Sequence, residues 1–327
     1  MRPQSLLNVL VSPAVAASCS STPLLCTAPF SPSYEKQLAK NSATFHMNFN
    51  KRDTGRKANG ALASVSIDWT ANDVDSLGRK PFVEGLDSFD SWAPDIKISD
   101  HIHVNDGNKA AILYYFQGHQ TGEFNGVPPS GNAIEILNGE FMLFDEDVLL
   151  NRLITVNEND ILQLQVTGKQ KVGKFQDIKL ISTPPTEKEY QEKIKNVASQ
   201  FNKNFNLRKT KSNAALTTTD VQVLTDQGTK HGRDALLALF DRYETSFPDL
   251  LAHDEYILAE GHLTAIEFIW LGTFSSPFKA SNGSTVQPDG KSYRTRGMRW
   301  MRHNDEGLVD AVWQVATNDD LITNVQN

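Results

Sequence analysis

The sequence predicts an α+β protein made of two tandem modules, each with helices packed on a curved antiparallel sheet. The main evidence is a set of residue pairs that recur at one spacing. The pairs are Asp95 and Asp249, Gly118 and Gly272, and Phe124 and Phe278, each 154 residues apart (249 − 95, 272 − 118, 278 − 124). In both copies, moreover, helical patterns precede strand-like patterns. A constant offset over so long a distance indicates duplication, so one module is used twice.

Length and composition limit the classes of protein that this chain can be. Its 327 residues are enough for two domains, and 39% hydrophobic with 22% charged residues are typical of a globular protein. The net charge of −7 argues against a broad basic surface, so we expect no nucleic-acid partner. No stretch approaches the roughly 20 apolar residues that a membrane-spanning helix needs.

Residues 1–33 read as a leader and not as part of a module. A short apolar run at 6–17 ends in small residues, which fits an exported protein with a signal cleaved near Ala16 or Ala17. The residues before Cys19 also resemble a bacterial lipobox, which would attach a lipid anchor to that cysteine. An organellar leader and an uncleaved tail on a cytoplasmic protein are the alternatives. Because Cys19 and Cys26 are the only cysteines, neither module can hold a disulfide or cysteine-ligated zinc.

Each module is expected to begin with an amphipathic helix. Apolar residues at 34, 38, 45 and 49 indicate a helix over 34–49, and a helix over 190–205 repeats the pattern. A polar connector follows, and a second helix is predicted over 78–89 and over 232–243. Both second helices run into Pro-Asp, which suits a helix end and a turn.

About four antiparallel strands are expected to complete each module. A strand over 110–117 would place Ile112, Tyr114 and Phe116 on one large apolar face, which its counterpart over 264–271 repeats. Two more strands follow in each copy, over 133–144 and 148–156 in the first and over 292–303 and 308–316 in the second. Helices on one face of such a sheet leave a cone with an open mouth, where pockets commonly form.

The expected module boundaries follow from these elements. We assign 34–177 to the first module and 190–327 to the second. The linker over 178–189 contains Pro184-Pro185. We expect the two modules to pack together as an intramolecular pseudo-dimer within a monomeric chain.

Five short runs resemble one known family. They are Gly-Arg-x-x-Phe at 78–82, Pro-Asp-Ile at 94–96, Asn-Asp-Gly-Asn-Lys-Ala-Ala at 105–111, Gly-His-Gln-Thr-Gly-Glu-Phe-Asn-Gly at 118–126 and Pro-Pro-Ser-Gly at 128–131. Together they resemble the SnoaL-like polyketide cyclases of the nuclear-transport-factor-2-like (NTF2-like) superfamily. The resemblance covers 60–168 well and 230–322 more loosely. It implies two NTF2-like cones that pair through their sheets.

The resemblance also implies an activity. Members of the family close a polyketide ring by intramolecular aldol condensation without a cofactor, and an acidic residue near the end of the last strand moves the proton. That position falls on Asn157 in the first copy and on Ala316 in the second. Neither side chain can act as a carboxylate base, although a slip of one residue would bring in Glu158 or Thr317.

The strongest catalytic candidates lie in the segment most like the family. His119 can serve as a base or donor near neutral pH, and a partly buried Glu123 could have a raised pKa. Asn157 is the third candidate by its place in the alignment. The alternative is a structural histidine at a strand end and a solvated glutamate. Since the second copy has Thr273 and Pro277 at these positions, any such chemistry belongs to the first module.

Six further residues are candidates for substrate binding: Trp92, His101, His103, Tyr115, Arg296 and Arg302. The two histidines are two apart on an expected strand and should share a face, but a metal site would need more ligands, so we expect no metal. The two arginines are an even number of residues apart on one expected strand, so they should lie on the same face and could bind an anion bidentately. The alternative interpretation is that the aromatic residues belong to the core and that the arginines are solvated at the surface.

These observations leave two functions open. One is a cofactor-independent, SnoaL-like cyclase or isomerase acting on a small carbonyl compound in the first cone. The other is a non-catalytic protein that binds a small apolar or anionic molecule, with the second module as its structural partner. The sequence contains no nucleophile elbow, P-loop or dinucleotide fingerprint, so nothing points to a nucleotide or flavin.

Overall fold

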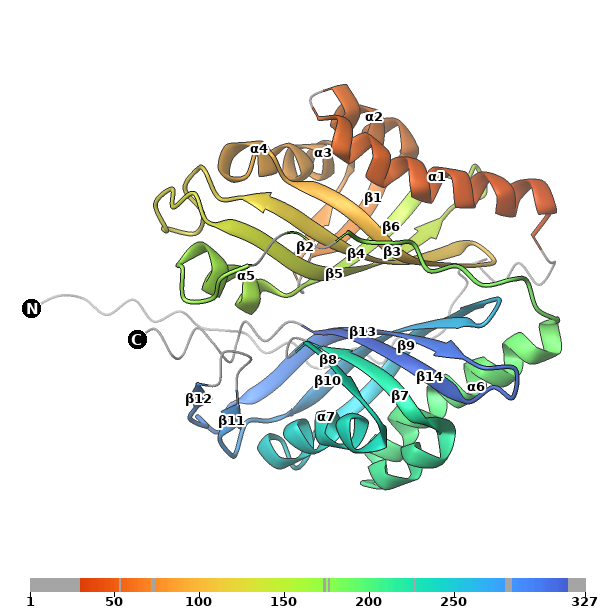
Figure 1. The fold of residues 1–327 in the computed structure, drawn as a ribbon. Helices are drawn as coiled ribbons and strands as arrows, with labels where there is room; N and C mark the ends of the chain where they lie inside the picture. Colours follow the sequence, from red (N-terminus) through yellow and green to blue (C-terminus); the bar gives the residue numbers. More distant parts are fainter. Residues whose placement is uncertain are drawn as a thin grey trace, which may run out of the picture.

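The computed structural model describes residues 30–316 apart from 53, 72–73, 173–174, 176, 226–227 and 280–283. The expected leader therefore lies outside the described residues except for 30–33. Figure 1 shows two α/β layers stacked with their sheets facing each other and their long helices on the outside. In this part of the chain no helix is long and apolar enough to cross a membrane.

The first module contains five helices and six strands among the described residues. They are α1 (Pro32–Lys51), α2 (Thr54–Leu62), β1 (Ala63–Ala71), β2 (Val74–Leu77), α3 (Arg79–Asp87), α4 (Phe89–Trp92), β3 (Lys97–Asp106), β4 (Lys109–His119), β5 (Ala133–Phe144), β6 (Leu150–Asn157) and α5 (Asn159–Val166). The strand order in the sheet is β2-β1-β6-β5-β4-β3.

The second module repeats this order after residue 187. Its elements are α6 (Lys188–Asn206), the 3₁₀ helix η1 (Thr210–Leu216), β7 (Thr217–Thr225), β8 (Gly228–His231), α7 (Arg233–Ser246), β9 (Leu251–Glu260), β10 (Leu263–Thr273), β11 (Phe278–Lys279), β12 (Thr285–Val286), β13 (Ser292–His303) and β14 (Val309–Ala316). The main sheet has the order β8-β7-β14-β13-β10-β9, which is the first sheet with each strand replaced by its counterpart.

The prediction that only a polar connector follows the first helix of each module is wrong. The connector contains a hairpin, β1–β2 in the first module and β7–β8 in the second, so each main sheet has six strands and not about four. β1 pairs with β6 in parallel and β7 pairs with β14 in parallel, which makes both sheets mixed. The strands β2 and β8 are exposed and lack the apolar alternation that marks a half-buried strand. In β1, however, Val65, Ile67 and Trp69 alternate with polar residues, and this signal was missed.

Each helical layer covers one face of its sheet, as the period-2 pattern predicted. In the first module Ile112, Tyr114 and Phe116 of β4 pack with Phe45 and Phe49 of α1 in one buried cluster. Ser31 caps α1, since its hydroxyl accepts a hydrogen bond from the backbone N–H of Tyr34. The cone interior of this module is therefore rich in aromatic side chains.

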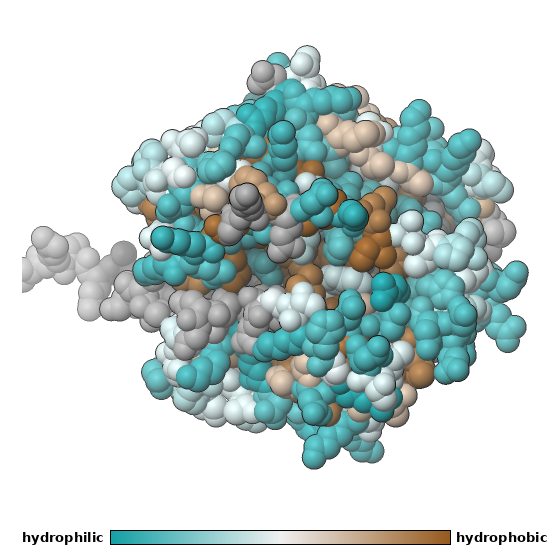
Figure 2. Space-filling model, viewed as in Figure 1, coloured by the Kyte–Doolittle hydropathy of each residue, from teal (hydrophilic) through white to brown (hydrophobic). Residues whose placement is uncertain are grey.

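A third apolar core joins the two modules. It is formed by the other faces of both sheets and includes Leu113 and Phe141 from the first module and Ala265, Trp300 and Val315 from the second. This core places the sheets face to face, so each serves as the cover that the other needs. Figure 2 shows a largely hydrophilic surface on which hydrophobic side chains gather along the band between the modules.

Matching hydrogen bonds at matching positions show that the duplication preserves side-chain geometry. The amide of Asn50 at the end of α1 bonds both the C=O and the N–H of Ile98, at 2.8 and 2.7 Å. Asn206 at the end of α6 bonds Ala252 in the same two ways, at 2.7 Å each. Each asparagine fixes the edge strand of its sheet to the long helix.

Candidate functional site

The described residues form one buried chain of ionisable groups, between α1 and the first sheet. Tyr114 donates to Glu140 at 2.8 Å, and Nε2 of His46 donates to the same carboxylate at 3.0 Å. Nδ1 of His46 donates to Asp100 at 2.5 Å, and Nε2 of His103 donates to the other oxygen of Asp100 at 3.0 Å. We call these five residues the acid–base chain.

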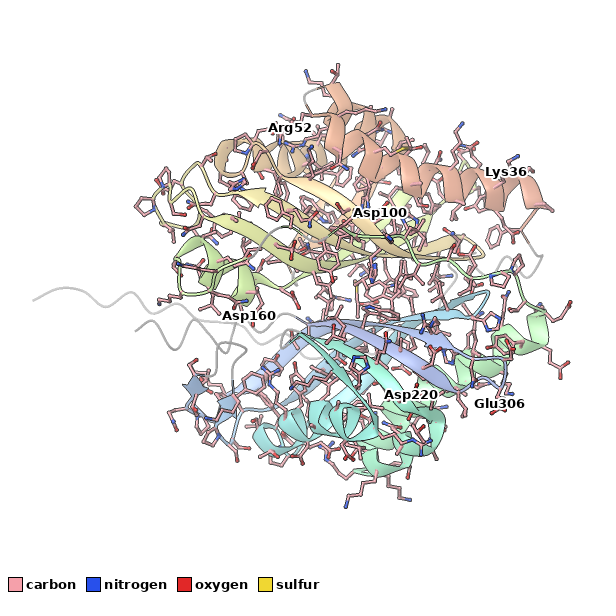
Figure 3. The ribbon with its side chains drawn as sticks, viewed as in Figure 1. Lys36, Arg52, Asp100, Asp160, Asp220 and Glu306 are labelled. Atoms are coloured by element: carbon pink, nitrogen blue, oxygen red, sulfur yellow. The ribbon has the colours of Figure 1, made fainter. Side chains whose placement is uncertain are left out.

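Secondary structure brings the members of the chain together from four elements. His46 comes from the buried side of α1, and Asp100 with His103 from β3. Tyr114 comes from β4 and Glu140 from β5, on neighbouring strands with their side chains on the helix-facing side. Figure 3 shows Asp100 between α1 and the sheet of the first module. Tyr114, Glu140 and His46 are buried, whereas the side chain of Asp100 is 25% exposed and that of His103 is 16% exposed.

Electrostatics keeps His46 and Asp100 charged across the neutral range. Burial alone would lower the pKa of His46, but the charges of Asp100 and Glu140 raise it to about 10. Burial would raise the pKa of Asp100, but the charges and N–H groups of His46 and His103 hold it well below its usual range. Burial, together with the Glu140 carboxylate, raises the pKa of Tyr114 well above that of free tyrosine. His46 is thus an imidazolium held between two carboxylates.

The second module has a different set of groups at the same place. Asn202 replaces His46 and donates to Asp254 at 2.5 Å, where Asp254 is the counterpart of Asp100. Arg299 replaces Glu140, and its guanidinium donates to Asn202 at 2.9 Å and to Gln314 at 3.0 and 2.8 Å. Phe268 replaces Tyr114. Histidine partners for this aspartate are therefore a feature of the first cone and not of the second.

The expectation that His101 and His103 share a face is wrong. The β3–β4 register shifts between Asp100 and Ile102, so a β-bulge at His101 breaks the alternation of side chains. His103 bonds Asp100 on the helix side. His101 instead bonds the backbone C=O of Lys179 at 3.0 Å and contacts the ring of Trp313 across the module interface. Burial lowers the pKa of His101.

His119 and Glu123 lie outside the acid–base chain. The backbone N–H and Nδ1 of His119 bond the two oxygens of Asp95, at 2.7 and 2.6 Å, near the surface. In the second module the backbone N–H and hydroxyl of Thr273 bond Asp249 at 2.7 Å each. The shared geometry shows that this aspartate ties the end of the strand to the preceding turn in both copies. The Glu123 side chain is exposed.

The other first-module candidates are divided between the two faces of the sheet. Trp92 is buried in the helix-side core, with its ring 4.4 Å from that of Phe124. Tyr115 packs against the core between the modules, and burial, with the charges of Glu158 and Glu135, raises its pKa to about 12. Asn157 ends β6 opposite Asn138 of β5. Glu158 is buried and accepts a hydrogen bond from the backbone of Leu137.

Arg296 and Arg302 point away from the second cone. Both lie on the same face of β13 as Met298 and Trp300, which belong to the core between the modules. Arg296 is buried in an ion pair with Glu267, and Arg302 pairs with Asp310 at 2.8 Å. The arginine of β13 that does face the cone is Arg299, which has the opposite parity.

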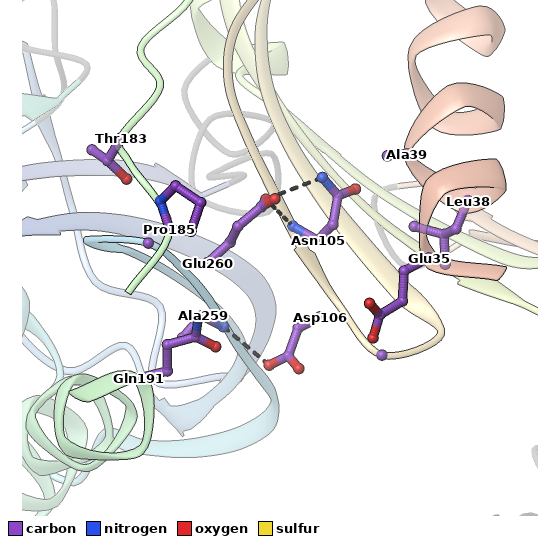
Figure 4. A pocket seen from close by; sticks show the side chains of 12 residues that line it. Glu35, Leu38, Ala39, Asn105, Asp106, Thr183, Pro185, Gln191, Ala259 and Glu260 are labelled. Atoms are coloured by element: carbon purple, nitrogen blue, oxygen red, sulfur yellow. Dashed lines mark hydrogen bonds between the residues drawn. The ribbon is translucent and has the colours of Figure 1, made fainter. Parts of the chain in front are cut away.

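A separate cavity of about 320 Å³ lies between the modules. Its walls come from the start of α1, the β3–β4 and β9–β10 turns, the 183–185 segment and α6. Figure 4 shows Glu260 accepting hydrogen bonds from Asn105, and Asp106 accepting one from the backbone of Ala259. Lys195 also pairs with Asp106 at 2.7 Å. These bonds fix one module to the other and occupy the carboxylates of Asp106 and Glu260.

Sequence reasoning missed three members of the acid–base chain: His46, Asp100 and Glu140. A signal was present, because Asp100 recurs as Asp254 at the spacing of the repeat, whereas its neighbours Ser99 and His101 are replaced by other residues. Glu140 is likewise a charged residue inside an apolar strand. The described residues contain no group of three His, Cys, Asp or Glu side chains arranged to hold a metal ion.

Comparison with known proteins gives one family match. Residues 198–311 match the family model described as a SnoaL-like domain, which confirms the resemblance for the second module. The match falls on the copy in which the quoted motifs are weaker. None of the curated proteins matches this chain.

Several solved structures are similar to a part of the chain. One, assigned as a SnoaL-like polyketide cyclase from Jannaschia sp. CCS1, is 12% identical with a TM-score of 0.38, and the match covers 43% of this chain and 97% of that one. IdmH from Streptomyces antibioticus, assigned as a polyketide cyclase, is 17% identical with a TM-score of 0.37 and coverages of 40% and 99%. An NTF2-like protein from Exiguobacterium sp. 255-15 is 14% identical, with a TM-score of 0.32 and coverages of 36% and 98%.

The class of protein follows from the architecture together with the family match. The chain consists of two tandem α+β modules with the same strand order, each a sheet covered by helices on one face. The second of them carries the match to the SnoaL-like domain.

Proposed function

We propose that the first module is a cofactor-independent acid–base catalyst of the SnoaL-like kind, acting on a small carbonyl compound. The observation that carries the proposal is the acid–base chain, which runs from a buried tyrosine to a partly exposed carboxylate. The second module supports it as an internal comparison. It keeps the aspartate but has Asn202, Arg299 and Phe268 in place of the titratable partners.

Within this proposal the members of the chain have different roles. Asp100 is the base, because it is ionised and its side chain is a quarter exposed, so a substrate C–H can reach it. His46 and His103 are positioning residues that hold this carboxylate ionised and oriented. Glu140 and Tyr114 fix the far nitrogen of His46. The reaction is removal of a proton next to a carbonyl, and the resulting enolate either attacks a second carbonyl or is reprotonated.

The test measures proton removal without needing the natural substrate. Exchange of α-protons in D₂O is followed by proton NMR for acetylacetone and small aryl ketones. We expect Asp100→Asn to slow the enzyme-dependent exchange by about 100-fold or more, the usual contribution of a general base. Asp254→Asn is the matched control in the second module and should retain the rate. Equal rates for Asp100→Asn and the unchanged protein would exclude this role.

A second function is favoured by one specific observation. Every N–H and O–H of His46 and Tyr114 has a partner, and His46 remains protonated until about pH 10. Such a group holds charge and does not exchange it near neutral pH. The alternative is therefore a binding protein in which the chain anchors α1 to the sheet, and recovery of an unaltered small molecule from the purified protein would support it.

We also propose that the chain is exported, as its first 33 residues suggest. Cleavage near Ala16 or Ala17, or a lipid on Cys19, would each change the intact mass in a characteristic way. Denaturing mass spectrometry of protein from its own host tests this, and an unmodified full-length mass would contradict it.

A further inference from the structure

The interior of the second module contains a buried cation that has no carboxylate partner in hydrogen-bond contact. Arg299 is fully buried, and it donates hydrogen bonds to the amide oxygens of Asn202 and Gln314. The charge of Asp254 acts on Arg299 without direct contact, because Asn202 lies between them and bonds both groups. Burial lowers the pKa of Arg299 to about 10, against an ordinary value of 12.5, so its charge is poorly solvated.

The guanidinium also has unused donors. Arginine carries five N–H groups, and three of those of Arg299 donate to described residues. One N–H on each terminal nitrogen has no acceptor in the described part of the chain. A pair of N–H groups on the two terminal nitrogens matches the two oxygens of a carboxylate.

A second orphaned donor lies in the same interior. The indole N–H of Trp270 is buried and has no hydrogen-bond partner among the described residues. The rings of Trp270 and Phe268 are 5.1 Å apart, and the guanidinium carbon of Arg299 lies 5.0 Å from the ring of Phe268 and 5.3 Å from that of Phe240. Aromatic faces therefore enclose the cation and continue towards the second donor.

We propose that the second module binds a small organic acid, whose carboxylate pairs with Arg299 and whose apolar body packs against Phe240, Phe268 and Trp270. A singly charged carboxylate fits better than a phosphate, because the aromatic surroundings make burial of a second negative charge costly. The first module cannot bind the same ligand in this way, since Glu140 stands at the position of Arg299 and would repel it. The site is distinct from the acid–base chain, so it can be tested separately from the function proposed for the first module.

The experiment compares carboxylates with neutral amides of the same shape on the full chain. Benzoate, phenylacetate and octanoate are titrated by isothermal calorimetry and by tryptophan fluorescence, with benzamide and phenylacetamide as controls. At least one carboxylate should bind at one site per chain, about tenfold to hundredfold more tightly than its amide, as expected for hydrogen bonds to a charged group. Failure of all three carboxylates to bind, or equal binding of acid and amide, would overturn the proposal.

Variants locate the site. Arg299→Met should abolish carboxylate binding, and Arg302→Met on the same strand should retain it, because Arg302 points away from the cone. Trp270→Phe keeps the cation and the aromatic wall, so it should weaken binding by about tenfold or less, as for loss of one neutral hydrogen bond. It provides a second reading if Arg299→Met does not fold. Carboxylate binding that is unchanged in both Arg299→Met and Trp270→Phe would place the ligand elsewhere.

Discussion

Asn202 stands in the second module where His46 stands in the first, and each side chain joins two polar groups of its sheet. His46 donates to two carboxylates, Asp100 and Glu140. Asn202 donates to Asp254 through its N–H and accepts from Arg299 through its oxygen. An imidazolium fits between two anions, whereas a neutral amide fits between an anion and a cation. The two modules therefore keep one geometry with the charge at one strand position reversed.

Removing the imidazolium should destabilise the first module strongly. In His46→Gln the Asp100 and Glu140 carboxylates lose the buried charge that separates them, and breaking a buried ion pair costs about 3–5 kcal/mol. Urea denaturation followed by far-UV circular dichroism measures the free energy of unfolding. His262→Gln is a control at a less buried histidine and should cost less. A loss below about 1 kcal/mol for His46→Gln would mean that the chain is less strongly coupled than its geometry indicates.

The pH dependence of stability should show a maximum near pH 6.5. The pKa of His46 is raised from 6.5 to about 10 on folding, so its contribution is complete below 6.5 and is lost as pH rises to about 10. The pKa of buried His303 is instead lowered to about 4, so stability falls as pH drops from 6.5 towards 4. The titration of each histidine changes the free energy of unfolding by at most about 1.4 kcal/mol per pH unit.

Chemical denaturation at several pH values tests this shape. His46→Gln should remove the loss between pH 6.5 and 10 and leave the loss between pH 6.5 and 4 that His303 causes. If His46→Gln loses as much stability between pH 6.5 and 10 as the unchanged protein does, groups other than His46 cause that loss.

His119→Thr should be tolerated, because Thr273 performs the same task in the second module. The threonine hydroxyl can bond Asp95 as Thr273 bonds Asp249, and the group is near the surface. We expect stability within about 0.5 kcal/mol of the unchanged protein and unaltered α-proton exchange. A large loss of exchange with stability preserved would restore His119 as a catalytic residue, and Glu123→Gln provides the parallel test of Glu123.

The first module alone should not remain a monomer. A fragment of residues 30–187 exposes the apolar face that contains Leu113, Phe141 and Ile154, which the second sheet covers in the full chain. Size-exclusion chromatography with light scattering should show a dimer or aggregates, while the full chain should be monomeric. A soluble, stably folded monomeric fragment would contradict the view that the second module acts as the cover.

Local patterns determined most of the architecture. The repeat spacing established two modules, and apolar periodicity located the long helices and the strands β4, β5, β13 and β14 to within about two residues. The face assignment of Tyr114 also followed from period-2 alternation. The edge strands β2 and β8 have no buried face and hence no alternation to recognise, whereas the alternation in β1 was present and was missed.

The site was decided only by the tertiary structure. His46 and Glu140 are 94 residues apart, and no local pattern indicates that a helix carries one to the other. Because of the bulge at His101, this histidine lies at the module interface, whereas His103 belongs to the acid–base chain. The sequence by itself determined which residues are apolar, and thereby the fold. Contacts between polar groups distant in the chain depend on how helix and sheet meet, and only the packed structure specifies that.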